Sequence, residues 1–253
     1  MSSRLELFAI PGFPMVREGD DLPALIADGA GRAGLTLQDR DVVVLAQKIV
    51  SKAEGRSVDL ASVVPSAEAE KLAAEVGKDP RLVQVVLSDS VKVVRSRPNL
   101  MIMQHRLGFV MANAGIDQSN VPGGDEAVLL LPENPDASAQ RLRNQLREQS
   151  GVAVAVLIID SFGRAWRNGV TGTAIGVAGM PALVDLRGEK DREGRMLKVT
   201  QVAAADELAA AASLVMGQAD EGTPAVLVRG FPYALRESGV HELLRPEAED
   251  LFR

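Results

Sequence analysis

The stretch VAVAVLIIDSFGRAWR at residues 152–167 decides the fold. Its first eight residues are apolar without interruption, which is typical of a β-strand that is covered on both faces. Asp160 and Ser161 follow at the end of this run. A rigid strand fixes the direction of a carboxylate at its end, and the neighbouring hydroxyl adds a second oxygen suited to a hard cation. The stretch therefore predicts a central strand that carries a polar site, although an Asp that only caps a turn would give the same pattern.

Other short runs rich in apolar and β-branched residues predict further strands. They span residues 5–10, 41–46, 91–94, 100–103, 109–111, 127–131 and 225–229. The run at 127–131 is as continuous as the one at 152–159, so we expect it to be central too. Apolar residues three and four apart predict helices at residues 22–32, 66–76, 80–87, 138–149 and 202–216. The last of these is apolar around most of its circumference, which predicts burial in a core or between subunits.

Residues 161–201 contain many glycines and charges without clean periodicity, which predicts loops. Within them, residues 187–195 are expected to form a solvated hairpin or loop. With 253 residues, 25% charged and 46% hydrophobic, the chain has the composition of an ordinary globular protein. No repeat or linker marks a boundary. We therefore expect one α+β domain over residues 1–253, and the sequence leaves open whether it divides into two subdomains.

Charge and cysteine content narrow the classes of function. The formal charge of −6, without a basic run, argues against nucleic acid as a partner. No apolar run approaches the roughly 20 residues of a membrane helix, and the N-terminus lacks the apolar stretch of a signal peptide. The absence of Cys excludes disulfides and thiolate metal sites. We expect a cytoplasmic protein without a membrane partner.

A second polar cluster follows a strand at residues 108–120, GFVMANAGIDQSN. Gly115 lets a backbone approach a ligand closely, and Asp117 supplies the second carboxylate that a divalent ion needs beside Asp160. One metal would then unite two strand ends. The alternative is an Asx-rich turn that is satisfied by its own backbone.

Two more segments carry groups suited to a nucleotide. QKIVSKAEGR at residues 47–56 brings Lys48 and Lys52 four residues apart, on a helix face or a loop from which either could reach a phosphate. MGQADEGT at residues 216–223 leaves a helix and offers Gln218 to a cation and Asp220 or Glu221 to a base or ribose. A solvated lysine face and an ordinary helix-terminating turn are the alternatives.

Taken in order, these segments resemble the F420-0:gamma-glutamyl ligase family over nearly the whole chain. The resemblance rests on GFPMVREGDDL, QKIVSKAEGR, HRLGFVMANAGIDQSNV, LLPENPDASA, DSFGRAWRNG, AIGVAG and ADELAAAASLVMGQ. It implies that GTP activates the terminal carboxylate of the deazaflavin precursor F420-0 as an acyl phosphate, which the amine of L-glutamate then attacks, releasing GDP and phosphate. It also implies a γ-linked further glutamate, Mn²⁺ or Mg²⁺ with K⁺ as a possible addition, and an intertwined homodimer.

The resemblance also assigns residues. It implies metal ligation by Asp117, Asp160, Ser161 and Gln218. We expect phosphate or substrate contacts by Lys52, and by Arg164 and Arg167 because guanidinium groups near a metal-binding carboxylate suit such anions. We assign no catalytic base, because positioning alone serves this reaction. The resemblance implies nucleotide contacts by Gly12, Phe13, Pro14, Met15, Gln47, Lys48, Lys52, Asn120, Met216, Gly217, Gln218, Ala219, Asp220, Glu221, Gly222 and Thr223. Two alternatives remain open: a related nucleotide-dependent ligase acting on another small acid, and a non-catalytic nucleotide-binding protein.

Overall fold

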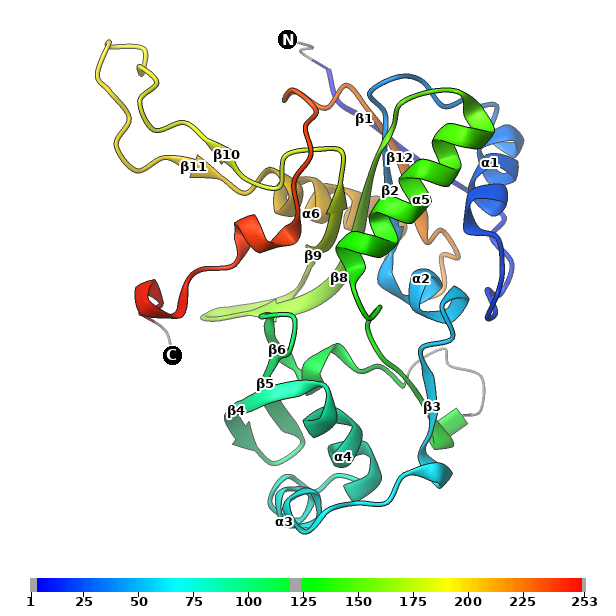
Figure 1. Cartoon of the computed structure of the whole chain (residues 1–253), viewed down its shortest axis with the longest axis vertical. Helices are drawn as coiled ribbons and strands as arrows, with labels where there is room; N and C mark the ends of the chain where they lie inside the picture. Colours follow the sequence, from blue (N-terminus) through cyan, green and yellow to red (C-terminus); the bar gives the residue numbers. More distant parts are fainter. Residues whose placement is uncertain (1–3, 119–123, 252–253) are drawn as a thin grey trace.

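A five-stranded sheet forms the larger part of the fold (Figure 1). The computed structural model describes residues 4–118 and 124–251. The strands follow the order β1 (Glu6–Ala9), β12 (Ala225–Arg229), β2 (Val42–Ala46), β8 (Ala155–Arg164) and β9 (Arg167–Ala178). β2 and β8 are parallel, and the other neighbours are antiparallel. The prediction of a central strand from residues 152–159 is confirmed, because β8 lies inside the sheet and residues 155–159 are buried on both faces.

Helices cover both faces of this sheet (Figure 1). α1 (Leu22–Arg32) and α5 (Pro135–Ser150) pack together on one face, and α6 (Ala204–Met216) lies on the other. α2 (Gln47–Ala53) follows β2 directly. Local signals set the ends of α5: the Asn134 side chain accepts a hydrogen bond from the amide of Ala137, and Gly151 ends the helix in the left-handed conformation.

Residues 57–118 and 124–130 belong to an insertion between α2 and α5 with a hydrophobic core of its own, whereas Phe109 and Met111 of this segment are buried in the core around the five-stranded sheet. Two small sheets, β3-β7 and β4-β5-β6, lie in it beside two helices. The elements are β3 (Ser57–Asp59), η1 (Leu60–Ser62), α3 (Ala67–Val76), α4 (Pro80–Ser88), β4 (Ser90–Arg97), β5 (Leu100–His105), β6 (Val110–Ala112), η2 (Asn113–Gly115), η3 (Gly124–Glu126) and β7 (Ala127–Leu129). The rest of the described chain is called the sheet unit below.

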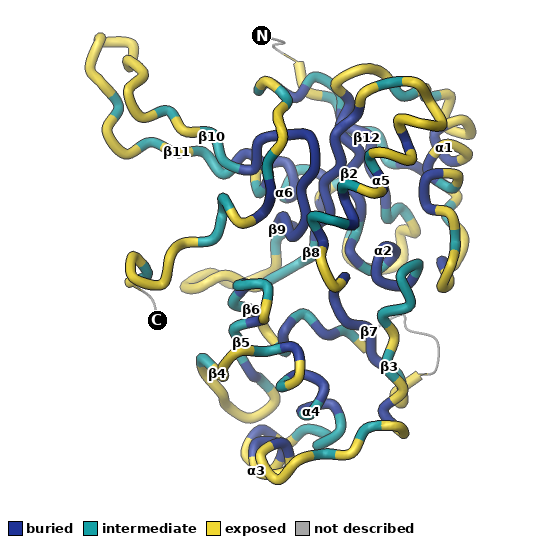
Figure 2. The backbone as a smooth tube through the Cα atoms, in the orientation of Figure 1, coloured by how far each residue is buried: buried dark blue, intermediate teal, exposed yellow. Residues whose placement is uncertain are grey.

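An exposed arm extends away from the sheet unit (Figure 2). β10 (Val184–Asp185) pairs with β11 (Gln201–Val202) at its base, and the predicted hairpin or loop of residues 187–195 lies exposed near its tip. The C-terminal part adds η4 (Val240–Leu243) and η5 (Glu247–Glu249). Among the helices of the described residues, none has the length and apolar character needed to cross a membrane.

The loop predicted from residue 161 onward is wrong as far as residue 178, because β8 and β9 form a long hairpin there. The glycines of β9 serve close packing. A Cβ atom on Gly172 would lie 2.4 Å from the carbonyl oxygen of Ala209 in α6, and one on Gly176 would lie 2.5 Å from that of Pro135 in α5. Glycine inside a strand is typical of such close backbone approach. A register shift between the two glycines lets them face helices on opposite sides of the sheet.

The prediction that residues 127–131 form a central strand is also wrong. β7 pairs only with β3 in a two-stranded sheet. Its segment is continuously apolar for another reason: Val128 and Leu130 are buried in the core of the insertion, and Leu131 is buried in the core of the sheet unit. The chain passes from one core to the other at this point.

We predict that Gly176→Ala destabilises the protein by about 1–3 kcal/mol, because the added methyl group collides with backbone atoms that cannot move independently. Gly163→Ala is the matched control, since Gly163 lies in the same hairpin with open space around its Cβ position. Guanidinium unfolding followed by circular dichroism measures the difference. Equal unfolding midpoints for the two variants would contradict the packing role of Gly176.

Candidate functional site

Several loops meet at one edge of the five-stranded sheet. β1, β2 and β8 run in the same direction, so their carboxyl ends lie at this edge, and β12 begins there. Such edges are where α/β sheets commonly bind ligands. Backbone hydrogen bonds of 2.9 Å join Ala46 to Pro224 and Ile10 to Ala225 across it. The edge therefore gathers the predicted segments that follow β1, β2 and β8 and that precede β12.

Asp117 reaches this edge from the insertion. Its backbone exchanges two hydrogen bonds with Leu129, of 3.0 and 2.8 Å, which fixes its position beside β7. One carboxylate oxygen lies 2.7 Å from Nζ of Lys48 on α2. This ion pair joins the insertion to the sheet unit, so Asp117 and the segment after β2 belong to one site.

Asp160 lies close enough to Asp117 and Lys48 for their charges to affect its ionisation. Its pKa is raised to about 6. Burial is the largest cause and the nearby Asp117 carboxylate adds to it, while the Ser161 amide and Lys48 act in the opposite direction. A carboxylate costs free energy to ionise when it is buried near another negative charge. The predicted pair of strand-end carboxylates is therefore brought together, and a cation beside it would relieve the unfavourable charge.

Lys52 lies on the inner side of α2 and is only 9% exposed. Burial lowers its pKa, Lys48 lowers it further, and Asp117 raises it. A poorly hydrated ammonium group of this kind gains much from an anionic ligand. Gln47 is buried one turn earlier, where its side-chain oxygen accepts a 2.8 Å hydrogen bond from Ser51. Lys52 and Lys48 are thus the cationic groups of the segment.

Ser161 and Gln218 form a second oxygen-bearing pair at the edge. Ser161 Oγ donates to Gln218 Oε1 at 2.9 Å, and Gln218 Nε2 donates to Ser213 Oγ at 2.8 Å. Ser213 on α6 thereby orients the amide of Gln218. The sequence did not predict Ser213 as a site residue, because it lies in a helix that is apolar around most of its circumference. The only feature of the sequence that could have indicated its role is a buried hydroxyl group among the apolar side chains of α6.

The loop of residues 216–223 is held largely by its own hydrogen bonds. Thr223 Oγ1 donates to the Met216 carbonyl oxygen at 3.0 Å, and the Glu221 carboxylate accepts from the Ala219 amide at 2.8 Å. The pKa of Glu221 is lowered, and the hydrogen bond from the Ala219 amide is the largest of several backbone contributions to this shift. Because Glu221 is engaged within the loop, Asp220 is the exposed acid that remains there for a ligand.

The turn at Gly12, Phe13, Pro14 and Met15 follows β1 at the same edge. Arg32 donates to the Gly12 carbonyl oxygen at 2.9 Å and holds the turn against α1. Pro14 and Met15 line a cleft of about 460 Å³ together with residues of the loop and start of α1. The turn thus borders a space that could hold part of a ligand.

Arg164 and Arg167 lie away from the carboxylates. They face each other at the exposed tip of the β8–β9 hairpin, on either side of Ala165 and Trp166. Arg164 is four strand residues beyond Asp160, or about 13 Å. The structure does not bring the arginines into the carboxylate cluster. Asn120, another predicted contact, lies outside the described residues.

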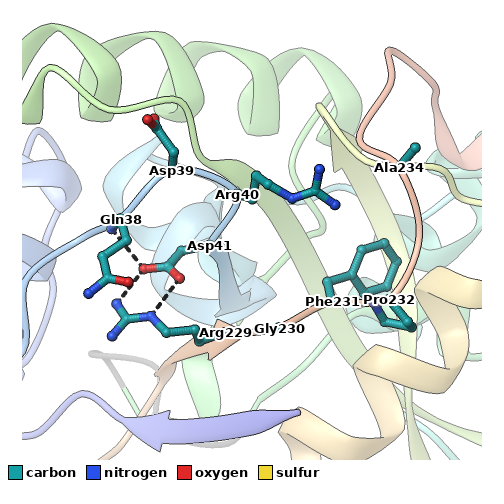
Figure 3. A pocket seen from close by; sticks show the side chains of 9 residues that line it. All are labelled: Gln38, Asp39, Arg40, Asp41, Arg229, Gly230, Phe231, Pro232 and Ala234. Carbon is teal, nitrogen blue, oxygen red and sulfur yellow. Dashed lines mark hydrogen bonds and ion pairs between the residues drawn. The ribbon is translucent and has the colours of Figure 1, made fainter. Parts of the chain in front are cut away.

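A cleft of about 600 Å³ lies at the opposite end of β2. Figure 3 shows the residues that line it. Its floor is an ion pair in which Arg229 donates to both carboxylate oxygens of the buried Asp41, at 2.9 and 2.7 Å. This cleft is separated from the candidate site by the length of a five-residue strand, about 16 Å. It contains none of the predicted site residues.

The donor set fits a hard divalent cation. Asp117 and Asp160 provide carboxylates, and Ser161 and Gln218 provide neutral oxygens, which are the ligand types that Mg²⁺ and Mn²⁺ prefer. Within residues 4–118 and 124–251, no three acidic or histidine side chains cluster as a complete metal site. Two carboxylates are few for a metal cage but are typical of sites that a substrate phosphate completes.

Comparison with known proteins agrees with this geometry. The family model described as F420-0:Gamma-glutamyl ligase matches residues 12–230. The chain is 47% identical to the coenzyme F420:L-glutamate ligase of Methanothermobacter thermautotrophicus, covering 98% of this chain and 99% of that protein. It is 48% identical to the protein of the same name from Methanopyrus kandleri, with 98% of each chain covered, and 43% identical to that of Archaeoglobus fulgidus, with 99% and 97% covered. The chain therefore belongs to the F420-0:gamma-glutamyl ligase family.

Proposed function

We propose that this protein is a ligase that adds L-glutamate to the coenzyme F420-0 precursor at the expense of GTP. The proposal includes a further, γ-linked glutamate after the first. The paired Asp117 and Asp160 carboxylates beside Lys48 and Lys52 are the observation that carries it, because they provide a cation site next to phosphate-binding groups. The family and the names of its near full-length relatives support the choice of glutamate and F420-0.

The reaction needs an activated carboxylate. An amine does not displace the oxygen of a free carboxylate, whereas phosphate leaves readily from an acyl phosphate. We propose that the terminal carboxylate of F420-0 takes the γ-phosphoryl group of GTP, with GDP as leaving group, and that the glutamate amine then displaces phosphate. Catalysis by positioning and charge stabilisation is sufficient for both steps, so no protein nucleophile is required.

Each residue of the site has a part in this scheme. Asp117, Asp160, Ser161 and Gln218 would hold Mg²⁺ or Mn²⁺, which neutralises phosphate charge when bound. Lys52, with its poorly solvated ammonium group, would bind a phosphate oxygen. Lys48 neutralises Asp117 in this structure. Lys48 lies beside the proposed cation site and would contact a phosphate oxygen as well.

Other predicted residues would surround the nucleotide and the substrate. The turn of residues 12–15 and the loop of residues 216–223 border the same edge and would contact the nucleotide. Arg164 and Arg167, about 13 Å farther along the hairpin, are suited to negative groups on the distal part of the F420-0 precursor. Guanidinium groups suit such contacts because they present paired donors in one plane.

The direct test is to incubate the protein with F420-0, GTP, Mn²⁺ and L-glutamate and to weigh the products by mass spectrometry. We expect products heavier by one and by two glutamyl residues, with one GDP released for each. Hydrolysis of GTP without a glutamyl product would contradict the proposed function. Turnover with a different carboxylate would favour a related ligase, and GTP binding without any turnover would favour a non-catalytic protein.

Asp117→Asn and Asp160→Asn should each lower the rate of glutamate addition at limiting Mn²⁺ by at least about 100-fold, since even outer-shell changes at metal sites cost 10–100-fold. Each variant keeps the size of the side chain and removes a charge from the cation site. Asp59→Asn is the control, because this exposed Asp caps η1 and Asn can do the same. Near-normal activity of both site variants would exclude a cation shared by the two carboxylates.

We also propose that the protein is a homodimer. Leu214 on α6 is 88% exposed, although most apolar side chains of this helix are buried, and Val199 on the arm is 85% exposed. Exposed large apolar side chains on an extended arm and on a neighbouring helix are typical of surfaces that a second copy covers. An arm that packs against the surface of the partner subunit would give the intertwined homodimer that the family resemblance implies.

Light scattering after size exclusion should give twice the chain mass at micromolar concentration. Leu214→Asp together with Val199→Asp should shift the protein to a monomer, because both changes place charge in the proposed interface. Val64→Asp, at a valine of the insertion that is equally exposed at 86%, should leave the dimer intact. A wild-type chain that runs as a monomer would contradict the homodimer.

A further inference from the structure

A buried carboxylate lies where the insertion joins the sheet unit. Asp89, at the end of α4, is only 7% exposed. Arg106 Nε lies 2.9 Å from one of its oxygens, while His105 Nε2 and Arg56 Nη2 face the other oxygen at 3.6 and 3.8 Å. Burial raises the pKa of Asp89, but the contacts with His105 and Arg106 outweigh this and hold it below its ordinary value. Asp89 is therefore a buried negative charge surrounded by basic groups.

The two arginines also bind the chain segments that connect the insertion to the sheet unit. One connection leaves α2 and passes through Arg56, and the other runs from β7 through Leu131 and Glu133 to α5. Arg56 Nε donates to the Leu131 carbonyl oxygen at 3.0 Å, and Arg106 Nη1 donates to the Glu133 carbonyl oxygen at 2.9 Å. Asp89 thus links the two connections: it accepts a hydrogen bond from Arg106 and attracts the Arg56 guanidinium group electrostatically from 3.8 Å.

The same connections determine where Asp117 lies. Asp117 pairs with Leu129, which pairs with Ser57, and the next residue, Leu130, donates to the Arg56 carbonyl oxygen at 3.0 Å. The backbone of Asp117 is therefore hydrogen-bonded directly to β7, the strand that leads into one of the connections. Asp160, in contrast, is fixed on β8 of the sheet unit. Any rotation of the insertion about the connections changes the separation of the two carboxylates.

We propose that Asp89, together with Arg56 and Arg106, is a positioning residue that holds the insertion at the orientation in which Asp117 faces Asp160. This inference rests on the proposed cation site, and it assigns a role to a cluster that touches none of the proposed ligands. A buried carboxylate that faces three basic side chains suits the role, because removing its charge leaves those side chains uncompensated. A cluster needed only for the stability of the insertion would not control metal affinity or the orientation of the two parts.

The orientation can be measured without metal or substrate. The chain has no Cys, so Glu70→Cys on α3 and Asn144→Cys on α5 introduce the only thiols, both at exposed positions. Spin labels on these thiols report the distance between insertion and sheet unit by double electron–electron resonance. Labelled chains are diluted with unlabelled ones so that distances within one chain dominate. Asp89→Asn should broaden or shift the distance distribution.

The Mn²⁺ affinity is measured on unlabelled protein by electron paramagnetic resonance, because the signal of free Mn²⁺ decreases as the ion binds. Asp89→Asn should raise the Mn²⁺ concentration for half-saturation about tenfold, as is typical of residues behind metal ligands. Val83→Ala, which opens a cavity in the core of the insertion, is the control for lost stability, and Asp79→Asn is the control for a lost charge away from the connections. Both should bind Mn²⁺ like the wild type.

Arg106→Lys provides a second variant in case Asp89→Asn does not fold. Arg106 is half-exposed, and Lys keeps its charge but cannot reach Asp89 and Glu133 at once. Unchanged distances and unchanged Mn²⁺ affinity in Arg106→Lys and Asp89→Asn would overturn the positioning role. A wild-type protein that binds no Mn²⁺ would instead refute the proposed cation site, and the distances would still decide whether Asp89 fixes the orientation.

Discussion

The approach of two carboxylates from separate parts of the chain is the constraint on which this structure depends. Asp160 belongs to the sheet unit and Asp117 to the insertion, and the charge of Asp117 raises the free energy of ionising Asp160. Lys48 balances only part of this charge. Burial and a nearby like charge both disfavour the ionised form of Asp160. A bound cation would offset this cost. The arrangement therefore supports the proposal that the site binds a cation.

The topology explains why the ligands gather here. Parallel β2 and β8, with β1 in the same direction, deliver three carboxyl ends to one edge, and the chain before β12 returns to it. The insertion leaves from this edge and comes back to it, so its residues can close the site from the other side. The sheet unit supplies a rigid base, while the insertion supplies Asp117. Under the proposed cation site, this division makes the orientation of the two parts a determinant of metal binding.

The sequence predicted most strands and helices to within a few residues, because apolar periodicity and caps are local signals. It failed where packing between distant segments decides the outcome. β9 contains Gly172 and Gly176 because α6 and α5 approach it closely, and no local pattern reveals that approach. Asp117 and Asp160 were predicted as ligands because each follows an apolar run. Asp89 was missed, because its partners Arg56 and Arg106 meet it only in the folded chain.

The most direct measurement of the central claim is the anomalous scattering of Mn²⁺ in crystals grown with Mn²⁺ and a non-hydrolysable GTP analogue. A metal peak within about 2.0–2.3 Å of carboxylate oxygens from both Asp117 and Asp160, with nucleotide phosphate oxygens among the remaining ligands, is the predicted result. A peak bound by only one of the two residues, or a nucleotide bound elsewhere on the chain, would contradict the account.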